Sequence, residues 1–149
     1  MIILGIDPGI SSTGIAYIKD GQLLHSDTIK VPNRKGIKTF SEKMGFIVHG
    51  MIHSEYECDA IYVEQTFYKF KHAETSHHKF CGIVEYLYGS DRVRYIAPTT
   101  VKLTVTGSGK GSKEEIQKFV DKKFCTAYDS PDEADAIAIA YAGYLKEVE

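Results

Sequence analysis

Four acidic residues, far apart along the chain, have the types and spacing to bind divalent metal ions together. Asp7 and Glu64 each end a short apolar segment, and Asp132 and Asp135 are spaced to share one face of a helix. Carboxylates brought together resist ionisation, and a hard cation such as Mg²⁺ or Mn²⁺ removes that cost. Two such ions about 3.5–4 Å apart stabilise the attacking and leaving oxygens of a phosphodiester displacement. Together, the four acids predict a metal-dependent phosphodiester hydrolase.

Each acid, taken alone, also has an ordinary structural explanation. Asp7 precedes Pro-Gly and could form a turn. Glu64 could occupy a solvated strand end, and Asp132 could complement the dipole of a helix that begins there. Asp135 is followed by the apolar run AIAIAYAG and should face inward or sideways. The metal-site prediction therefore depends on all four residues converging.

Hydrophobic patterning predicts the elements that must position these acids. Apolar or alternating segments predict strands at residues 2–7, 14–19, 22–30, 60–64 and 93–97. Asp20-Gly21 predicts a hairpin turn between the second and third strands. Apolar residues at helical spacing predict helices over about 37–55, around 80–87, from Pro98, after Ser112 and over about 131–147. Ser112 and Glu115 form a capping box, whereas residues 65–79 show no clean period.

The resulting order, βββαβαβααα, predicts an α/β fold in which a five-stranded mixed sheet is flanked by helices. A chain of 149 residues supports one domain, which we place at 1–149. If the first and fourth strands are parallel neighbours, Asp7 and Glu64 project from the same sheet edge. Ligands bind at that edge in α/β folds.

Composition is that of an ordinary globular protein, with 43% hydrophobic and 26% charged residues. Three cysteines without a CxxC pair argue against a zinc site of the usual spacing and favour a reducing cytoplasm. No segment has the length of a membrane span. A net charge of −2 counts mildly against DNA binding, yet basic residues cluster at Lys30, Arg34, Lys35 and Lys38, at Lys69, Lys71, His72, His77, His78 and Lys79, and at Lys102, Lys110 and Lys113.

Four motifs resemble those of the RuvC-type Holliday-junction resolvases, in the family's order and over nearly the whole chain. They are GIDPGISSTGIA (5–16), YVEQTF (62–67), YIAPTTVKLTVTGSG (95–109) and DEADAIAIA (132–140). The resemblance implies an RNase H-like fold and an endonuclease that nicks four-way junctions and other branched DNA. It further implies Mg²⁺, replaceable by Mn²⁺, with two ions per active site, and a homodimer.

The resemblance also implies roles for individual residues. Asp7, Glu64, Asp132 and Asp135 match the family's metal ligands, and Lys102 and Lys113 match basic residues near the scissile phosphate. Phe67 matches an aromatic residue near the junction centre, where it would stack on an unpaired base, although core packing is its ordinary role. The expected DNA contacts are completed by Tyr68, Lys69, Lys71, Lys79 and Lys110.

Other functions compete with this one. GIDPGISSTG also resembles the first phosphate loop of actin-like and sugar-kinase ATPases, but that class needs two domains around a cleft. A different RNase H-like nuclease, acting on RNA–DNA hybrids or general branched DNA, and a junction-binding protein with a degenerate site are further alternatives. The chain is shorter than most bacterial members, as a compact phage-type member in an infected host would be. Residues 65–79 depart from the family pattern, so the resemblance does not extend to cleavage sequence or to a branch-migration motor.

Overall fold

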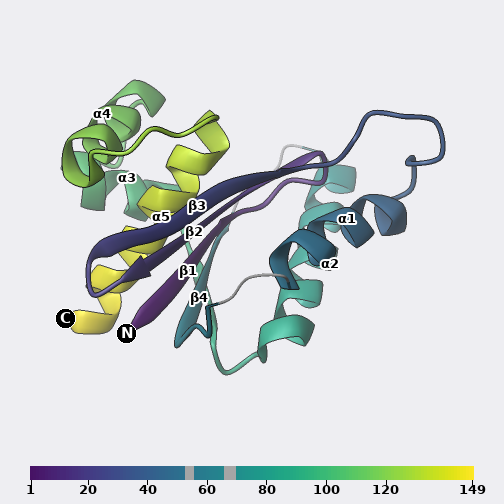
Figure 1. Ribbon diagram of the computed structural model, residues 1–149, viewed down its shortest axis with the longest axis horizontal. Coiled ribbons are helices and arrows are strands. Elements are labelled where there is room, and N and C mark those ends of the chain that lie inside the picture. The colour runs from purple at the N-terminus through teal and green to yellow at the C-terminus, as the bar shows by residue number, and fades with distance from the viewer. Residues whose placement is uncertain (53–55, 66–69) are drawn as a thin grey trace.

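The computed structural model describes residues 1–52, 56–65 and 70–149. Within these ranges, five strands form one mixed sheet, and five helices lie on its two faces (Figure 1). The elements follow the order βββαβαβααα, as the patterning predicts. None of these five helices combines the length and hydropathy that crossing a membrane requires.

The sheet has the strand order β3-β2-β1-β4-β5. Its strands are β1 (Ile2–Asp7), β2 (Ser12–Lys19), β3 (Gln22–Lys30), β4 (Ala60–Glu64) and β5 (Val93–Ile96). The first three form an antiparallel meander, and β4 and β5 extend it in parallel with β1. Asp20 and Gly21 both have positive φ, 49° and 80°, which is the geometry of the hairpin turn that their sequence predicts.

Alternate side chains of the buried strands face two different helical layers. Helices α1 (Phe40–Ile52) and α2 (Lys71–Tyr88) pack against one face, whose core includes Leu4, Ile6 and Ile61. The other face, with Ile3 and Ala16, is covered by α3 (Pro98–Thr106), α4 (Lys113–Phe124) and α5 (Pro131–Val148). Figure 1 shows the two layers on opposite sides of the sheet.

Two helix starts differ from the prediction. Helix α2 begins at Lys71, so the prediction of a helix only around 80–87 was too short. Its early buried position is His77, a polar residue that interrupts the apolar pattern. Helix α1 begins at Phe40, because Thr39 and Glu42 cap it reciprocally: the Thr39 hydroxyl accepts from the Glu42 N–H, and the Glu42 carboxylate accepts from the Thr39 N–H.

Two glycines let α5 lie directly on the sheet. A Cβ on Gly5 in β1 would lie 2.4 Å from the backbone nitrogen of Ala140. A Cβ on Gly14 in β2 would lie 2.1 Å from the carbonyl oxygen of Asp132. No larger residue fits at either position without moving α5. The first turn of α5 is therefore held against the end of the sheet that carries Asp7.

Candidate metal centre and active site

Two of the acids lie at the carboxyl ends of neighbouring parallel strands. Asp7 is the last residue of β1, and Glu64 is the last residue of β4. Ile6 is paired with Val63 in the parallel register, so the two acids follow side by side at the same sheet edge. The condition on which the shared edge depended, that these strands are parallel neighbours, is met.

The start of α5 supplies the other two acids. The Ser130 hydroxyl accepts from the Glu133 N–H at 3.3 Å and caps the helix. Glu133 points away from the cleft: it is buried, and its carboxylate accepts from the Ser26 hydroxyl at 2.5 Å and the Asp129 N–H at 2.9 Å. These bonds fix the first turn of α5 against β3.

Carboxylate oxygens of Asp7, Asp132 and Asp135 all lie within 4.8 Å of one another. Glu64 lines the same cleft, outside this group of three. The Ser12 hydroxyl donates to Asp132 at 2.7 Å, and the Lys113 ammonium lies 3.4 Å from an oxygen of Asp135. Three oxygen ligands this close together, one from β1 and two from α5, can hold a hard divalent cation.

The electrostatics of the cleft fit a cation. Burial, and then the charges of Glu64, Asp135 and Asp132, raise the pKa of Asp7 from 3.8 to about 8. Burial and the charge of Asp135 raise the pKa of Glu64 to about 7. Burial also raises the pKa of Asp135, against the opposing effect of Lys113. Because the metal-free site disfavours its own ionised form, a divalent cation bound among these oxygens relieves a real electrostatic cost.

The four acids and two lysines line one open cleft of about 440 Å³. Lys102 comes from α3, and Lys113 is the first residue of α4, where the Ser112–Glu115 capping box is formed as predicted. The charge of Asp135 raises the pKa of Lys113, so this side chain stays cationic. The cleft thus combines oxygen ligands for a metal with positive charge for a phosphate.

The remaining predicted DNA contacts lie elsewhere. Lys71, Lys79 and Lys110 are exposed and outside the lining of the cleft. Lys71 begins α2, Lys79 lies 5.5 Å from the ring centre of Phe40, and Lys110 lies in the loop before α4. The predicted contacts Phe67, Tyr68 and Lys69 lie outside the described residues.

Sequence reasoning missed three residues that shape the site. Ser12 donates to Asp132, Gly14 admits the first turn of α5, and Glu133 anchors that turn to β3. A small polar residue and a glycine in a strand that follows an acidic turn are the only sequence signals for the first two. The role of Glu133 has no local sequence signal, because its partner Ser26 lies on the distant β3.

Known proteins resemble this chain over almost its full length. The family model described as "Crossover junction endodeoxyribonuclease RuvC" matches residues 3–142. A protein of that description from Rickettsia prowazekii is 32% identical over 151 residues, covering 95% of each chain. Because this bacterial relative has a similar length, the comparisons give no support to the phage-type expectation.

Two solved structures share the fold. One is described as the Thermus thermophilus RuvC structure, with a TM-score of 0.77, 24% identity and coverage of 99% of this chain and 96% of that one. The other, with a TM-score of 0.80, 24% identity and coverage of 99% and 94%, is described as T. thermophilus RuvC in complex with Holliday junction substrate. These likenesses confirm the predicted RNase H-like architecture.

Proposed function

Because the chain belongs to the RuvC family of crossover junction endodeoxyribonucleases, we propose that it nicks four-way DNA junctions and related branched DNA during recombination and repair. The observation that supports this most directly is the convergence of Asp7, Asp132 and Asp135 beside Glu64 in one cleft. A DNA substrate agrees with the cytoplasmic location expected from the cysteines. Both core clusters share one sheet, which supports a single domain over 1–149.

Asp7, Glu64, Asp132 and Asp135 are the proposed metal ligands. Divalent ions held there would supply a more acidic water and neutralise charge on the departing oxygen. Two contacts position these ligands. The Ser12 hydroxyl donates to Asp132, and the close packing of α5 on Gly14 sets the distance of Asp132 and Asp135 from the sheet. Rigid ligands keep the reacting phosphate in one geometry.

The formal charge of the cleft supports two ions per active site. Four carboxylates and two lysines sum to −2, and a scissile phosphate brings the total to −3. One Mg²⁺ leaves an excess of negative charge, whereas two leave +1, which favours the anionic transition state. Mn²⁺, with the same preference for oxygen, should replace Mg²⁺.

Lys102 and Lys113 are proposed to bind the scissile phosphate or its neighbours. Lys113 begins a helix, where unpaired backbone N–H groups also favour an anion. Its ammonium is already held toward the cleft by Asp135. Lys71, Lys79 and Lys110, together with Phe67, Tyr68 and Lys69, remain the proposed contacts with more distant parts of the junction.

The test is a set of labelled substrates incubated with Mg²⁺: a four-way junction, a fork, a linear duplex and an RNA–DNA hybrid. We expect nicks in the junction that leave 5′ phosphates and 3′ hydroxyls, and loss of nicking in Asp7→Asn. Preferential cleavage of the hybrid would instead support the alternative RNase H-like nuclease. Junction binding without cleavage at any Mg²⁺ concentration would support the degenerate binding protein.

A homodimer is proposed because resolving a junction requires cuts in two strands, which a two-fold pair of sites can provide. Sedimentation velocity should give twice the chain mass. Mixed dimers of wild type and Asp7→Asn should nick only one of the two strands. A monomer that makes paired nicks would contradict this part of the proposal.

A further inference from the structure

Four exposed cations lie on one segment outside the carboxylate cleft. We call residues 30–39 the basic loop: it carries Lys30, Arg34, Lys35 and Lys38, and it joins β3 to α1. All four side chains are exposed. The proposed chemistry of the cleft uses none of them.

The basic loop leaves the sheet at the edge that carries the active site. Lys30 is paired with Ser12 across β2 and β3, and the Val31 N–H donates to the Ser11 carbonyl at 2.9 Å. Ser12 is the residue whose hydroxyl donates to Asp132. The loop therefore starts beside the proposed metal ligands, and Figure 1 shows it extending from there beyond the sheet to α1.

Among the described residues, the cations of the loop have no acidic partner. The ion pairs among the described residues are Met1–Asp20 and Lys113–Asp135, and neither involves the basic loop. The neighbouring acid, Glu42, accepts from the backbone N–H groups of Lys38 and Thr39 at the start of α1. The Arg34 guanidinium lies over the ring of Phe46, with 5.8 Å to its centre. Arg34 is thus held by Phe46, and the positive charge of the loop is left available to an external anion.

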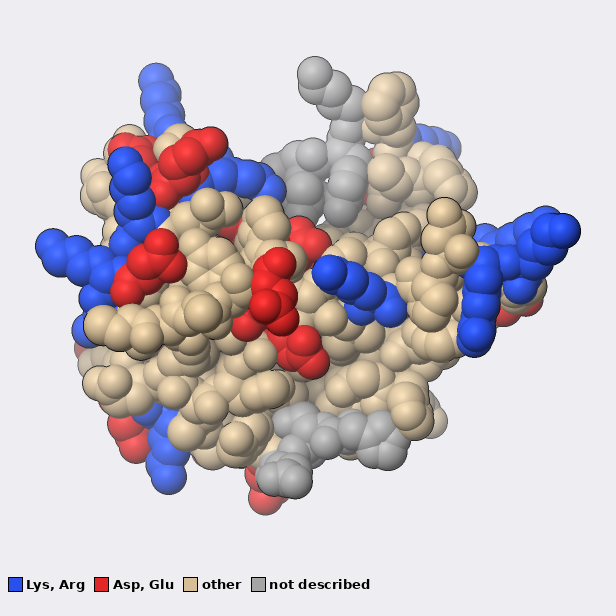
Figure 2. All heavy atoms as spheres, turned by 45° about the horizontal axis from the view of Figure 1, so that its top comes forward, with Lys and Arg blue, Asp and Glu red and all other residues tan. Residues whose placement is uncertain are grey.

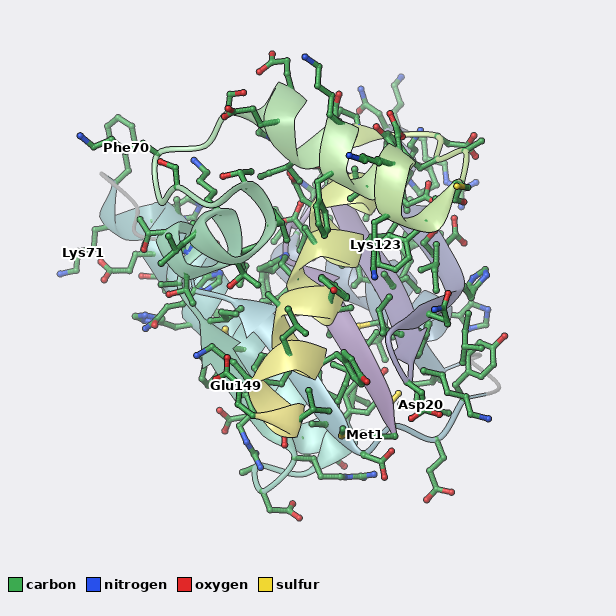
Figure 3. All side chains as sticks on the ribbon, turned by 90° about the vertical axis from the view of Figure 1, so that its left-hand side faces the viewer. Met1, Asp20, Phe70, Lys71, Lys123 and Glu149 are labelled. Carbon is green, nitrogen blue, oxygen red and sulfur yellow. The ribbon has the colours of Figure 1, made fainter. Side chains whose placement is uncertain are left out.

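Acidic groups collect at the opposite end of the sheet. Asp20 lies beside the N-terminus, Asp59 accepts from the Ile2 N–H, and Glu149 ends the chain. Figure 3 shows Met1, Asp20 and Glu149 toward one end of the molecule and Phe70 toward the other. In Figure 2, blue side chains gather at the right-hand end of the face, where Figure 1 places the basic loop and α1, whereas blue and red side chains are mixed at the left-hand end. The net charge of −2 therefore conceals a local concentration of positive charge on the basic loop.

We propose that the basic loop binds the phosphate backbone of a junction arm outside the cleft and so orients the substrate on the active site. The inference rests on the proposed junction substrate and names a further binding surface for it. The Ile37 N–H donates to the Arg34 carbonyl at 3.3 Å, so the loop turns at residues 34–37 and carries Lys35 in that turn.

The test measures junction affinity as a function of salt concentration. The parent protein carries Asp7→Asn so that binding is read without cleavage, and the test variant adds Lys35→Ala and Lys38→Ala. The matched control adds Lys19→Ala and Lys146→Ala, two exposed lysines at the acidic end. Arg34 is left intact because its contact with Phe46 adds a packing role.

Each lost phosphate contact lowers the slope of log affinity against log salt by about 0.9, so the test variant should lose about 1.8 from the slope. The test variant should bind the junction more weakly than the parent at 50 mM salt. Between 50 and 200 mM salt, its fold-loss of affinity should be about 12 times smaller than that of the parent. The control should have the same salt slope as the parent. Both variants should have the same melting temperature as the parent. If the test variant and the parent had equal salt slopes, and the parent bound junctions more tightly than duplex, this inference alone would be overturned. A parent with no junction preference would overturn the proposed function as well.

Discussion

Replacing Asp7 by asparagine should make the metal-free protein more stable while abolishing its proposed activity. Asp7 is partly buried beside three other carboxylates, and burial and their charges raise its pKa from 3.8 to about 8. Between these two values the folded protein holds a proton that the unfolded chain has released. Asp7 therefore costs the folded state nothing below about pH 4, and the free energy of unfolding falls as the pH rises from there toward 8.

The magnitude follows from the same shift. A pH of 7 lies about 3 pH units above the ordinary aspartate pKa of 3.8, and at about 1.36 kcal/mol per unit the penalty is about 4 kcal/mol. The cleft is open to water, which screens part of this, so we expect asparagine to recover about 2 kcal/mol. For a chain of this size, about 2–4 °C accompanies each kcal/mol, and the melting temperature should rise by about 4–8 °C.

The assay is thermal unfolding in EDTA and in Mg²⁺, at pH 5 and pH 8. Wild type should gain about 2.7 kcal/mol when Mg²⁺ is present at about 100 times its dissociation constant, whereas Asp7→Asn should gain little. The advantage of the variant in EDTA should shrink at pH 5. Asp27→Asn, an exposed acid on β3, is the matched control and should change neither value. A lower melting temperature for Asp7→Asn in EDTA at pH 8 would refute the reasoning.

Three further predictions follow from the same cleft. Glu64→Gln should also raise the melting temperature in EDTA, by less than Asp7→Asn because the pKa of Glu64 is raised only to about 7. Lys113→Ala removes the ammonium that competes with a cation for Asp135, so the Mg²⁺ concentration that gives half-maximal cleavage should fall. The maximal cleavage rate should nevertheless drop by about 10²-fold. An unchanged Mg²⁺ requirement would contradict this prediction. Gly14→Ala should push the first turn of α5 away, costing about 1–3 kcal/mol and most of the nicking rate. Gly45→Ala on α1, where an added Cβ meets nothing within 4 Å, should instead gain about 1 kcal/mol and keep activity, so equal effects at both positions would argue against the packing account.

Much of the fold could be predicted from the sequence because its strands carry strong local signals. The apolar segments ending at Asp7 and Glu64 are confirmed as β1 and β4, and the hairpin at Asp20-Gly21 is confirmed by positive φ at both residues. The sequence left the parallel pairing of β1 with β4 as a condition; the structure shows that pairing, which places the two acids at one edge. These features depend on periodicity and turn chemistry, which are properties of short segments.

Features that depend on tertiary partners could not be predicted in the same way. The start of α2 is hidden because its buried position is filled by His77, whose burial depends on the core beneath it. The bond from Ser12 to Asp132 joins residues 120 positions apart, and that from Ser26 to Glu133 joins residues 107 positions apart. Neither bond has a local pattern, since each exists only when α5 lies on the meander.

The start of α5 shows why the site needs both kinds of information. Asp132, Glu133 and Asp135 are chemically alike; the first two lie in the first turn of α5, and Asp135 lies just after it. At about 3.6 residues per turn, Asp132 and Asp135 lie about 60° apart around the axis, whereas Glu133 lies about 100° from one and 160° from the other. Only the docking of α5 on Gly14 decides which pair faces Asp7, and Glu133 then meets Ser26 on the other side. The spacing selects a pair of acids, and the glycine in β2 determines that this pair, together with Asp7, forms the metal site.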